Sequence, residues 1–181
     1  MRAWSTLLLA VACQPASSPA PATLGQSTIS LDGRRDPFRG GAIFGRCLDQ
    51  IHIFLTSVTV PRASITIHPM GTSAVGRHPL RPGNAIPPDP NPGDSTGPGP
   101  FLLDGVLPPE WSIEADSGFV ELAWDTQGRL RGILEAWILA PDSASSGPRP
   151  RLSPRRLTGT FLAYRDASLE PNLVRGVDCA R

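Results

Sequence analysis

The sequence predicts an all-β domain, folded as a single antiparallel β-sandwich or small β-barrel of about seven to nine strands. Short segments alternate apolar and polar side chains with a period of two, which is typical of half-buried strands. These segments are separated by stretches rich in the chain's 21 prolines and 18 glycines. No long segment has convincing helical periodicity, and the 181 residues, 40% of them hydrophobic, can bury one core but not two large ones.

The first clear alternation covers residues 50–60, and a shorter one covers residues 63–68. In residues 119–125, Val120, Leu122 and Trp124 fall on one face and acidic side chains on the other. Each run is rich in β-branched or aromatic residues, so we expect a strand at each of the three places.

Two further runs, 129–137 and 156–164, share the pattern R-L-x-G-x-[LF]-x-A-[WY]. Two similar strands joined by a loop are expected to be neighbours in a meander, because a solenoid needs at least three repeats. If the repeated apolar positions face the core, Trp137 and Tyr164 point outward beside Arg131 and form a candidate surface for a ligand or partner. The alternative is that a loop or a second sheet covers this face.

Residues 79–100 (PLRPGNAIPPDPNPGDSTGPGP) have proline or glycine at 12 of 22 positions. Such a density is incompatible with a helix or a central strand. We therefore expect a disordered loop that interrupts one β domain spanning residues 27–181 and is dispensable for folding.

The N-terminus has the features of an export signal. Residues 1–12 combine Arg2 with a short apolar run, too short to span a bilayer, and a proline-rich tether of residues 13–26 follows. Ala10-Val11-Ala12-Cys13 resembles the lipobox of bacterial lipoproteins, although leucine lies four rather than three residues before the cysteine. The resemblance implies cleavage before Cys13, acylation of Cys13, anchoring to the cell envelope and, with Gln14 next, transfer to an outer membrane. An ordinary A-x-A cleavage at the same bond, giving a secreted soluble protein, remains the alternative.

The cysteine count favours lipidation. With Cys13 acylated, Cys47 and Cys179 are left to form a disulfide in an oxidising compartment. Two buried free thiols are the alternative.

The charge of the chain excludes one class of partner. Formal net charge is +1, and without residues 1–12 the chain has 16 arginines and 16 acids, so nucleic-acid binding is not expected. Arginines cluster in a proline-rich segment, where they could contact an anionic surface or simply be solvated: Arg149, Arg151, Arg155 and Arg156.

No catalytic motif, metal motif or cofactor site is expected. His52 and His68 lie on candidate neighbouring strands, but solvated or hydrogen-bonded histidines are favoured over a metal site. The acids Glu114 and Asp116 near Trp111 are interpreted as loop residues rather than a glycosidase pair. Three functions remain: a non-catalytic envelope lipoprotein that is structural or binds an envelope protein, a lipocalin-like module for a small ligand or glycan, and an envelope hydrolase.

Overall fold

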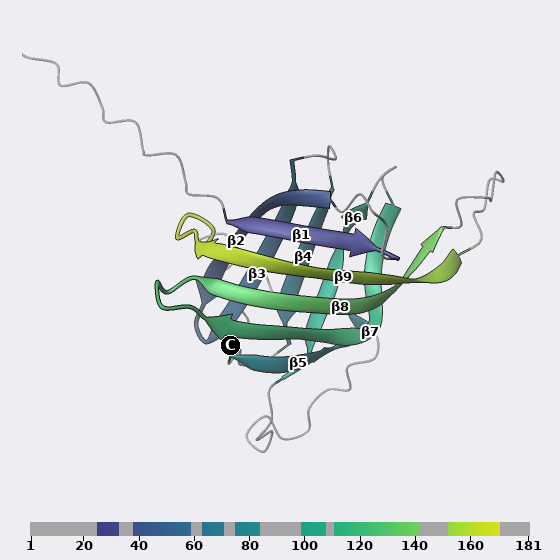
Figure 1. The fold of residues 1–181 in the computed structure, drawn as a ribbon. Coiled ribbons are helices and arrows are strands. Elements are labelled where there is room, and N and C mark those ends of the chain that lie inside the picture. Colours follow the sequence, from purple (N-terminus) through teal and green to yellow (C-terminus); the bar gives the residue numbers. More distant parts are fainter. Residues whose placement is uncertain are drawn as a thin grey trace, which may run out of the picture.

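The computed structural model describes residues 25–32, 38–58, 63–70, 75–83, 99–107, 111–141 and 152–170. The strands in these ranges are β1 (Gln26–Leu31), β2 (Phe38–Cys47), β3 (Gln50–Ser57), β4 (Ser64–Pro69), β5 (Gly76–Leu80), β6 (Phe101–Leu107), β7 (Trp111–Trp124), β8 (Leu130–Pro141) and β9 (Leu152–Arg165). They form one closed barrel in the order β1-β2-β3-β4-β6-β5-β7-β8-β9, and β9 pairs with β1 to close it (Figure 1). The fold is therefore all-β, and of the two predicted architectures it is the barrel.

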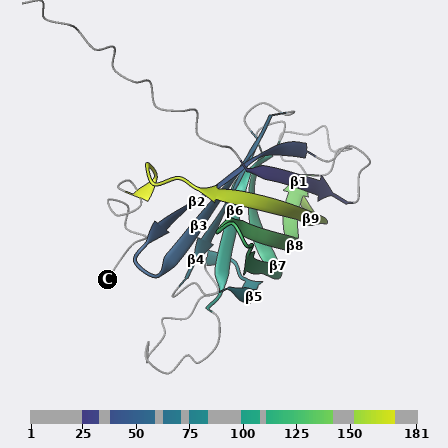
Figure 2. The same cartoon turned by 60° about the vertical axis from the view of Figure 1, so that its left-hand side comes forward.

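The barrel is mixed: most strand pairs are antiparallel, as expected, and two are parallel. The short strand β1 lies between β2 and β9. Ahead of the first residue of β1, β2 and β9 pair directly with each other and in parallel (Figure 2). The strand β5 lies in the same way between β6 and β7, and its contact with β6 is parallel. Both β2 and β9 are antiparallel to β1, and both β5 and β6 are antiparallel to β7, so the two strands of each pair run parallel to each other where they meet.

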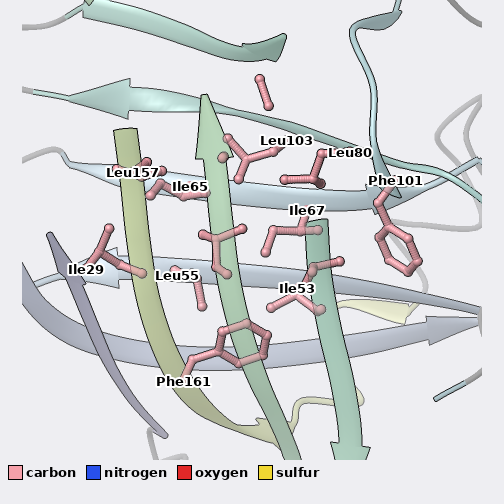
Figure 3. Close-up of a cluster of buried hydrophobic side chains, with 14 of the residues drawn as sticks. Ile29, Ile53, Leu55, Ile65, Ile67, Leu80, Phe101, Leu103, Leu157 and Phe161 are labelled. Carbon is pink, nitrogen blue, oxygen red and sulfur yellow. The ribbon is translucent and has the colours of Figure 1, made fainter. Parts of the chain in front are cut away.

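The interior of the barrel is filled by the apolar side chains of alternate residues on every strand. Ile53, Ile65, Ile67 and Leu103 come from three adjacent strands and are fully buried (Figure 3). Burying a side chain of this size contributes about 1.5–3 kcal/mol each. The remaining members include Ile29, Leu55, Leu80, Phe101, Leu157 and Phe161.

Phe161 of β9 occupies a space that Gly132 of β8 leaves open. The two residues are directly opposite in the β8–β9 pairing, and a Cβ atom on Gly132 would lie 1.9 Å from the ring of Phe161. A glycine is therefore required here by the close approach of a side chain, not by its backbone conformation.

As predicted, the two copies of the repeated pattern form neighbouring antiparallel strands, β8 and β9. Their antiparallel pairing explains the contact between Gly132 and Phe161. The glycine of each copy lies opposite the Leu or Phe position of the other: Gly132 pairs with Phe161, and Leu134 pairs with Gly159. The pattern thus places one small and one large residue in each pair, which is what a tightly packed barrel wall needs.

A β-bulge between Ala115 and Ser117 lets β7 change its neighbour from β6 to β5. Gly118 follows the bulge with φ of 134°, and a Cβ atom there would lie 2.1 Å from the carbonyl oxygen of Glu135. Both observations require glycine at this position.

The proline-rich segment is shorter than predicted at its start. Pro79 and Leu80 are the last residues of β5, and the side chain of Leu80 is part of the core. Pro79 pairs with Phe119 on a five-residue strand, where one missing N–H is tolerated. Residues 84–98 lie outside the described residues.

Candidate functional site

The outer side of β8 carries three large exposed apolar side chains of the described barrel wall. Ile133, Trp137 and Leu139 point outward at alternate positions and are 51%, 44% and 48% exposed. Leu152, opposite Pro141 at the start of β9, is 54% exposed. We call these four residues the β8 stripe. Exposed apolar residues collected on one face are typical of an interaction surface.

Charged side chains interrupt the β8 stripe without covering it. Between Ile133 and Trp137 lies Glu135, whose carboxylate accepts a contact of 2.9 Å from the guanidinium of Arg156. Arg156 in turn lies opposite Trp137 in the β8–β9 pairing. Tryptophan and arginine are both enriched in protein interfaces.

The predicted surface of Trp137, Tyr164 and Arg131 does not form a single patch. All three side chains occupy outward positions, as expected. However, Trp137 lies opposite Arg156, eight residues before Tyr164, so about 26 Å of strand separates the two aromatic residues. Arg131 lies opposite Leu162, close to the Tyr164 end.

Tyr164 belongs instead to a polar cluster at the turn between β7 and β8. The guanidinium of Arg129 donates to the hydroxyl of Tyr164 at 3.2 Å and also pairs with the carboxylate of Asp125. The hydrogen bond to Tyr164 and that to Asp125 raise the pKa of Arg129. Burial opposes ionisation of Asp125, but hydrogen bonds from the N–H groups and guanidinium of Arg129, and from the N–H of Gln127, lower its pKa. This cluster fixes the turn.

Two of the four clustered arginines are engaged in ion pairs. Arg155 contacts Asp32 at 2.7 Å, and Arg156 contacts Glu135. Arg149 and Arg151 lie outside the described residues. Of the four arginines predicted to contact an anionic surface, Arg155 and Arg156 instead form ion pairs that join β9 to the end of β1 and to β8.

Two histidines meet on the outer wall of the barrel. Ile53 and Ile67 are paired core residues; His52 on β3 precedes Ile53 and His68 on β4 follows Ile67, so the antiparallel register brings the two histidines face to face. Their Nδ1 atoms are 3.4 Å apart, and Nε2 of His68 lies 3.4 Å from Oδ2 of Asp104 on β6. His52 is fully buried although it alternates with inward residues, whereas the side chain of His68 is 24% exposed. The third histidine, His78, lies inside the barrel against the ring of Phe101.

Two of the acids near Trp111 line a surface hollow of about 370 Å³ beside the β7 bulge. Glu114 and Asp116 contribute to its wall together with Leu139 of the β8 stripe. A carboxylate oxygen of Glu114 accepts a hydrogen bond of 2.7 Å from the N–H of Gly83, which assigns this side chain a local structural role.

Cys47 ends β2 on the outer side of the barrel and is buried. Its sulfur is in a disulfide bond. Both other cysteines of the chain, Cys13 and Cys179, lie outside the described residues.

Comparisons with protein-family models, with curated proteins and with solved structures find no significant match to this chain. Within the described ranges, no helix has the length and apolar character needed to cross a membrane. The same residues contain no group of three or more His, Cys, Asp or Glu side chains that could hold a metal ion.

Proposed function

We propose that the chain is a non-catalytic, lipid-anchored protein of the cell envelope that binds another envelope protein through the β8 stripe. The carrying observation is the contrast between the two sides of the barrel wall. Alternate residues facing inward fill the interior with their own side chains, while Ile133, Trp137, Leu139 and Leu152 remain exposed on the outside. This favours an outward-facing binding surface over a lipocalin-like pocket for a small ligand.

The position of the tether supports the same proposal. The chain enters β1 opposite Leu162 of β9, whereas Trp137 lies opposite Arg156, about 20 Å further along the strand. The start of β1 and the start of β9 are on opposite sides of the barrel (Figure 1). With the lipid on Cys13, we expect the β8 stripe to remain accessible to partners, because Trp137, Leu139 and Leu152 lie toward the other end of the strands from the start of β1.

Anchoring follows from the N-terminal residues. Acyl chains contribute about 0.8 kcal/mol per buried CH₂, and one chain alone anchors only marginally, so multiple acylation of Cys13 gives stable attachment. The envelope leaflet facing the periplasm or the outside is the expected location. The proposal includes a disulfide between Cys47 and Cys179. Cys47 is disulfide-bonded, and if Cys13 is lipidated, Cys179 is the remaining cysteine of the chain that could be its partner.

Photo-cross-linking in cells tests the partner surface. We expect a photoreactive amino acid at Trp137 or Leu139 to cross-link one discrete protein, because these side chains are exposed and central to the β8 stripe. Thr56 and Thr66 occupy outward positions on β3 and β4 and serve as matched controls that should give no such product. Equal cross-linking from the stripe and the control positions, or none from the stripe, would contradict the proposal. Conjugates with glycan alone would favour the glycan-binding module instead.

Replacing the acylation site tests the anchor separately. Cys13→Ser is expected to move the protein from the membrane fraction to the soluble fraction, because the modified side chain is lost. Mass spectrometry of the unmutated mature N-terminus should show acylated Cys13. An unmodified Cys13 thiol in the mature protein would instead establish cleavage at the ordinary A-x-A site.

A further inference from the structure

The strands β7 and β8 separate at one end of their pairing. β8 pairs with β7 as far as Ile138, which lies opposite Ala115. Beyond Ile138, β8 continues beside β9 as far as Pro141, whereas β7 pairs with β6 ahead of Ala115. The paired ends of β8 and β9 thus extend past the wall that β7 forms (Figure 1). The hollow of about 370 Å³ lies at this separation, with Leu139 on one side and residues 112–116 on the other.

The backbone of Leu139 directs its N–H and C=O toward the hollow. In an antiparallel pair, opposite residues alternate between exchanging two hydrogen bonds and exchanging none. Arg156 uses its backbone groups on Asp32: its N–H donates to the carboxylate at 2.9 Å, and its C=O accepts from the N–H of Asp32 at 2.7 Å. Trp137, opposite Arg156, therefore directs its own backbone groups away from β9, and Leu139, two residues further along, does the same. Among the residues that the structure describes, β7 places none opposite Leu139. This part of β8 is an unpaired strand edge.

The side chains around the hollow are acidic on one side and apolar on the other. Glu114 and Asp116 are exposed side chains of β7 that line the hollow. Leu139 lines its other side and belongs to the β8 stripe, together with Trp137 two residues before it. Within the described part of the chain, the hollow has no basic side chain in its lining. Charge complementarity therefore favours an occupant that has a cationic group next to an apolar one.

We propose that an extended segment of the envelope partner enters this hollow and adds as a short strand to β8 at Leu139. The inference rests on the proposed function, because it names the part of the partner that meets the β8 stripe. An exposed strand edge is a template for pairing with another chain, in which main-chain hydrogen bonds supply affinity and alternate side chains supply specificity. The added strand presents a lysine or arginine to Glu114 and Asp116 and an apolar side chain to the β8 stripe.

Photo-cross-linking in cells from inside the hollow tests this strand addition. A photoreactive amino acid at Ser112, which lines the hollow but is not part of the β8 stripe, should capture the same protein as one at Trp137. Leu139→Pro removes the N–H that the added strand needs and should lower the yield from Ser112 about tenfold. Leu139→Val keeps both the N–H and an apolar side chain, so it is the matched control and should leave the yield unchanged.

A charge reversal tests the acidic side without altering a strand pairing. Asp116→Arg should lower the yield from Ser112 about tenfold or more, because like charges then meet in the hollow. Asp49→Arg makes the same change of charge at an exposed position in the turn between β2 and β3, and it should have no effect. Circular dichroism of each variant verifies that the barrel is folded.

Hydrogen exchange gives a readout that contact between side chains alone would not change. In the purified cross-linked complex, the amide of Leu139 should exchange more slowly than in the free protein, because it is bonded to the added strand. Unchanged exchange at Leu139, capture from Trp137 but not from Ser112, or full capture by folded Leu139→Pro would overturn the strand addition and leave the β8 stripe as the partner surface. Capture from neither position would overturn the proposed function and this inference with it.

Discussion

Replacing Phe161 by alanine is expected to lower the free energy of unfolding by about 3–5 kcal/mol, because the ring fills the barrel interior and its removal leaves a cavity. The ring of Phe161 packs against Gly132, so adding a side chain at Gly132 should also lower the free energy of unfolding. Gly132→Ala is expected to destabilise the fold by about 1–3 kcal/mol through overpacking, since the new methyl group meets the ring at 1.9 Å.

A double-mutant cycle shows whether the two effects share one cause. In the presence of Phe161→Leu, the cost of Gly132→Ala should shrink by about 0.5–3 kcal/mol, because the shorter side chain vacates the contested space. Urea denaturation of the four proteins measures this coupling energy. Gly83→Ala is the control, because a Cβ atom there would make only ordinary contacts with Glu114 and Leu102, at 3.6 and 3.7 Å. Strict additivity in the cycle would show that Gly132 is needed for another reason.

The second large effect is expected for Cys47→Ser, about 4–5 kcal/mol in the chain-entropy model, because the proposed bridge to Cys179 would close a loop of more than a hundred residues. This is a large share of the roughly 5–15 kcal/mol that stabilises a domain. Thermal unfolding with and without reductant measures the effect, and reductant should leave Cys47→Ser unchanged.

Peptide mapping without reduction identifies the partner of Cys47. A cross-linked peptide containing Cys47 and Cys179 is expected, and Cys179→Ser should then destabilise the protein as much as Cys47→Ser. A peptide joining Cys47 to Cys13 would refute both the pairing and the argument for lipidation from the cysteine count.

The period-two pattern predicted the barrel wall where each strand has one apolar and one polar face. Residues 50–60 and 63–68 became β3 and β4, and the repeated pattern became β8 and β9. The start of β7 was missed, because the bulge at Ala115 interrupts the alternation. The strand β2 was not anticipated either, since Gly40, Gly41 and Gly45 give it no readable alternation.

The candidate sites were predicted less well, because they depend on which strands are neighbours. His52 and His68 lie on consecutive strands and were expected to be near each other, but Asp104 reaches them only because β6 pairs with β4. For Trp137 and Tyr164 the repeat itself was misleading. Because β8 and β9 are antiparallel, the first residue of the nine-residue pattern in one copy lies opposite the last residue of the other copy. Trp137 and Tyr164, which are both last residues, therefore lie at opposite ends of the paired segment.

The pairing of the first strand with the last has a consequence for how the molecule is made. A chain that is synthesised or transported from its N-terminus presents β1 long before β9, yet Ser27 needs Phe161 as its neighbour. Until then the growing sheet keeps an open edge and an uncovered apolar face, and contacts so distant in sequence form slowly. Successful production of this protein therefore depends on protection of the unfinished sheet during that interval, by a chaperone or by rapid delivery of the C-terminal strands.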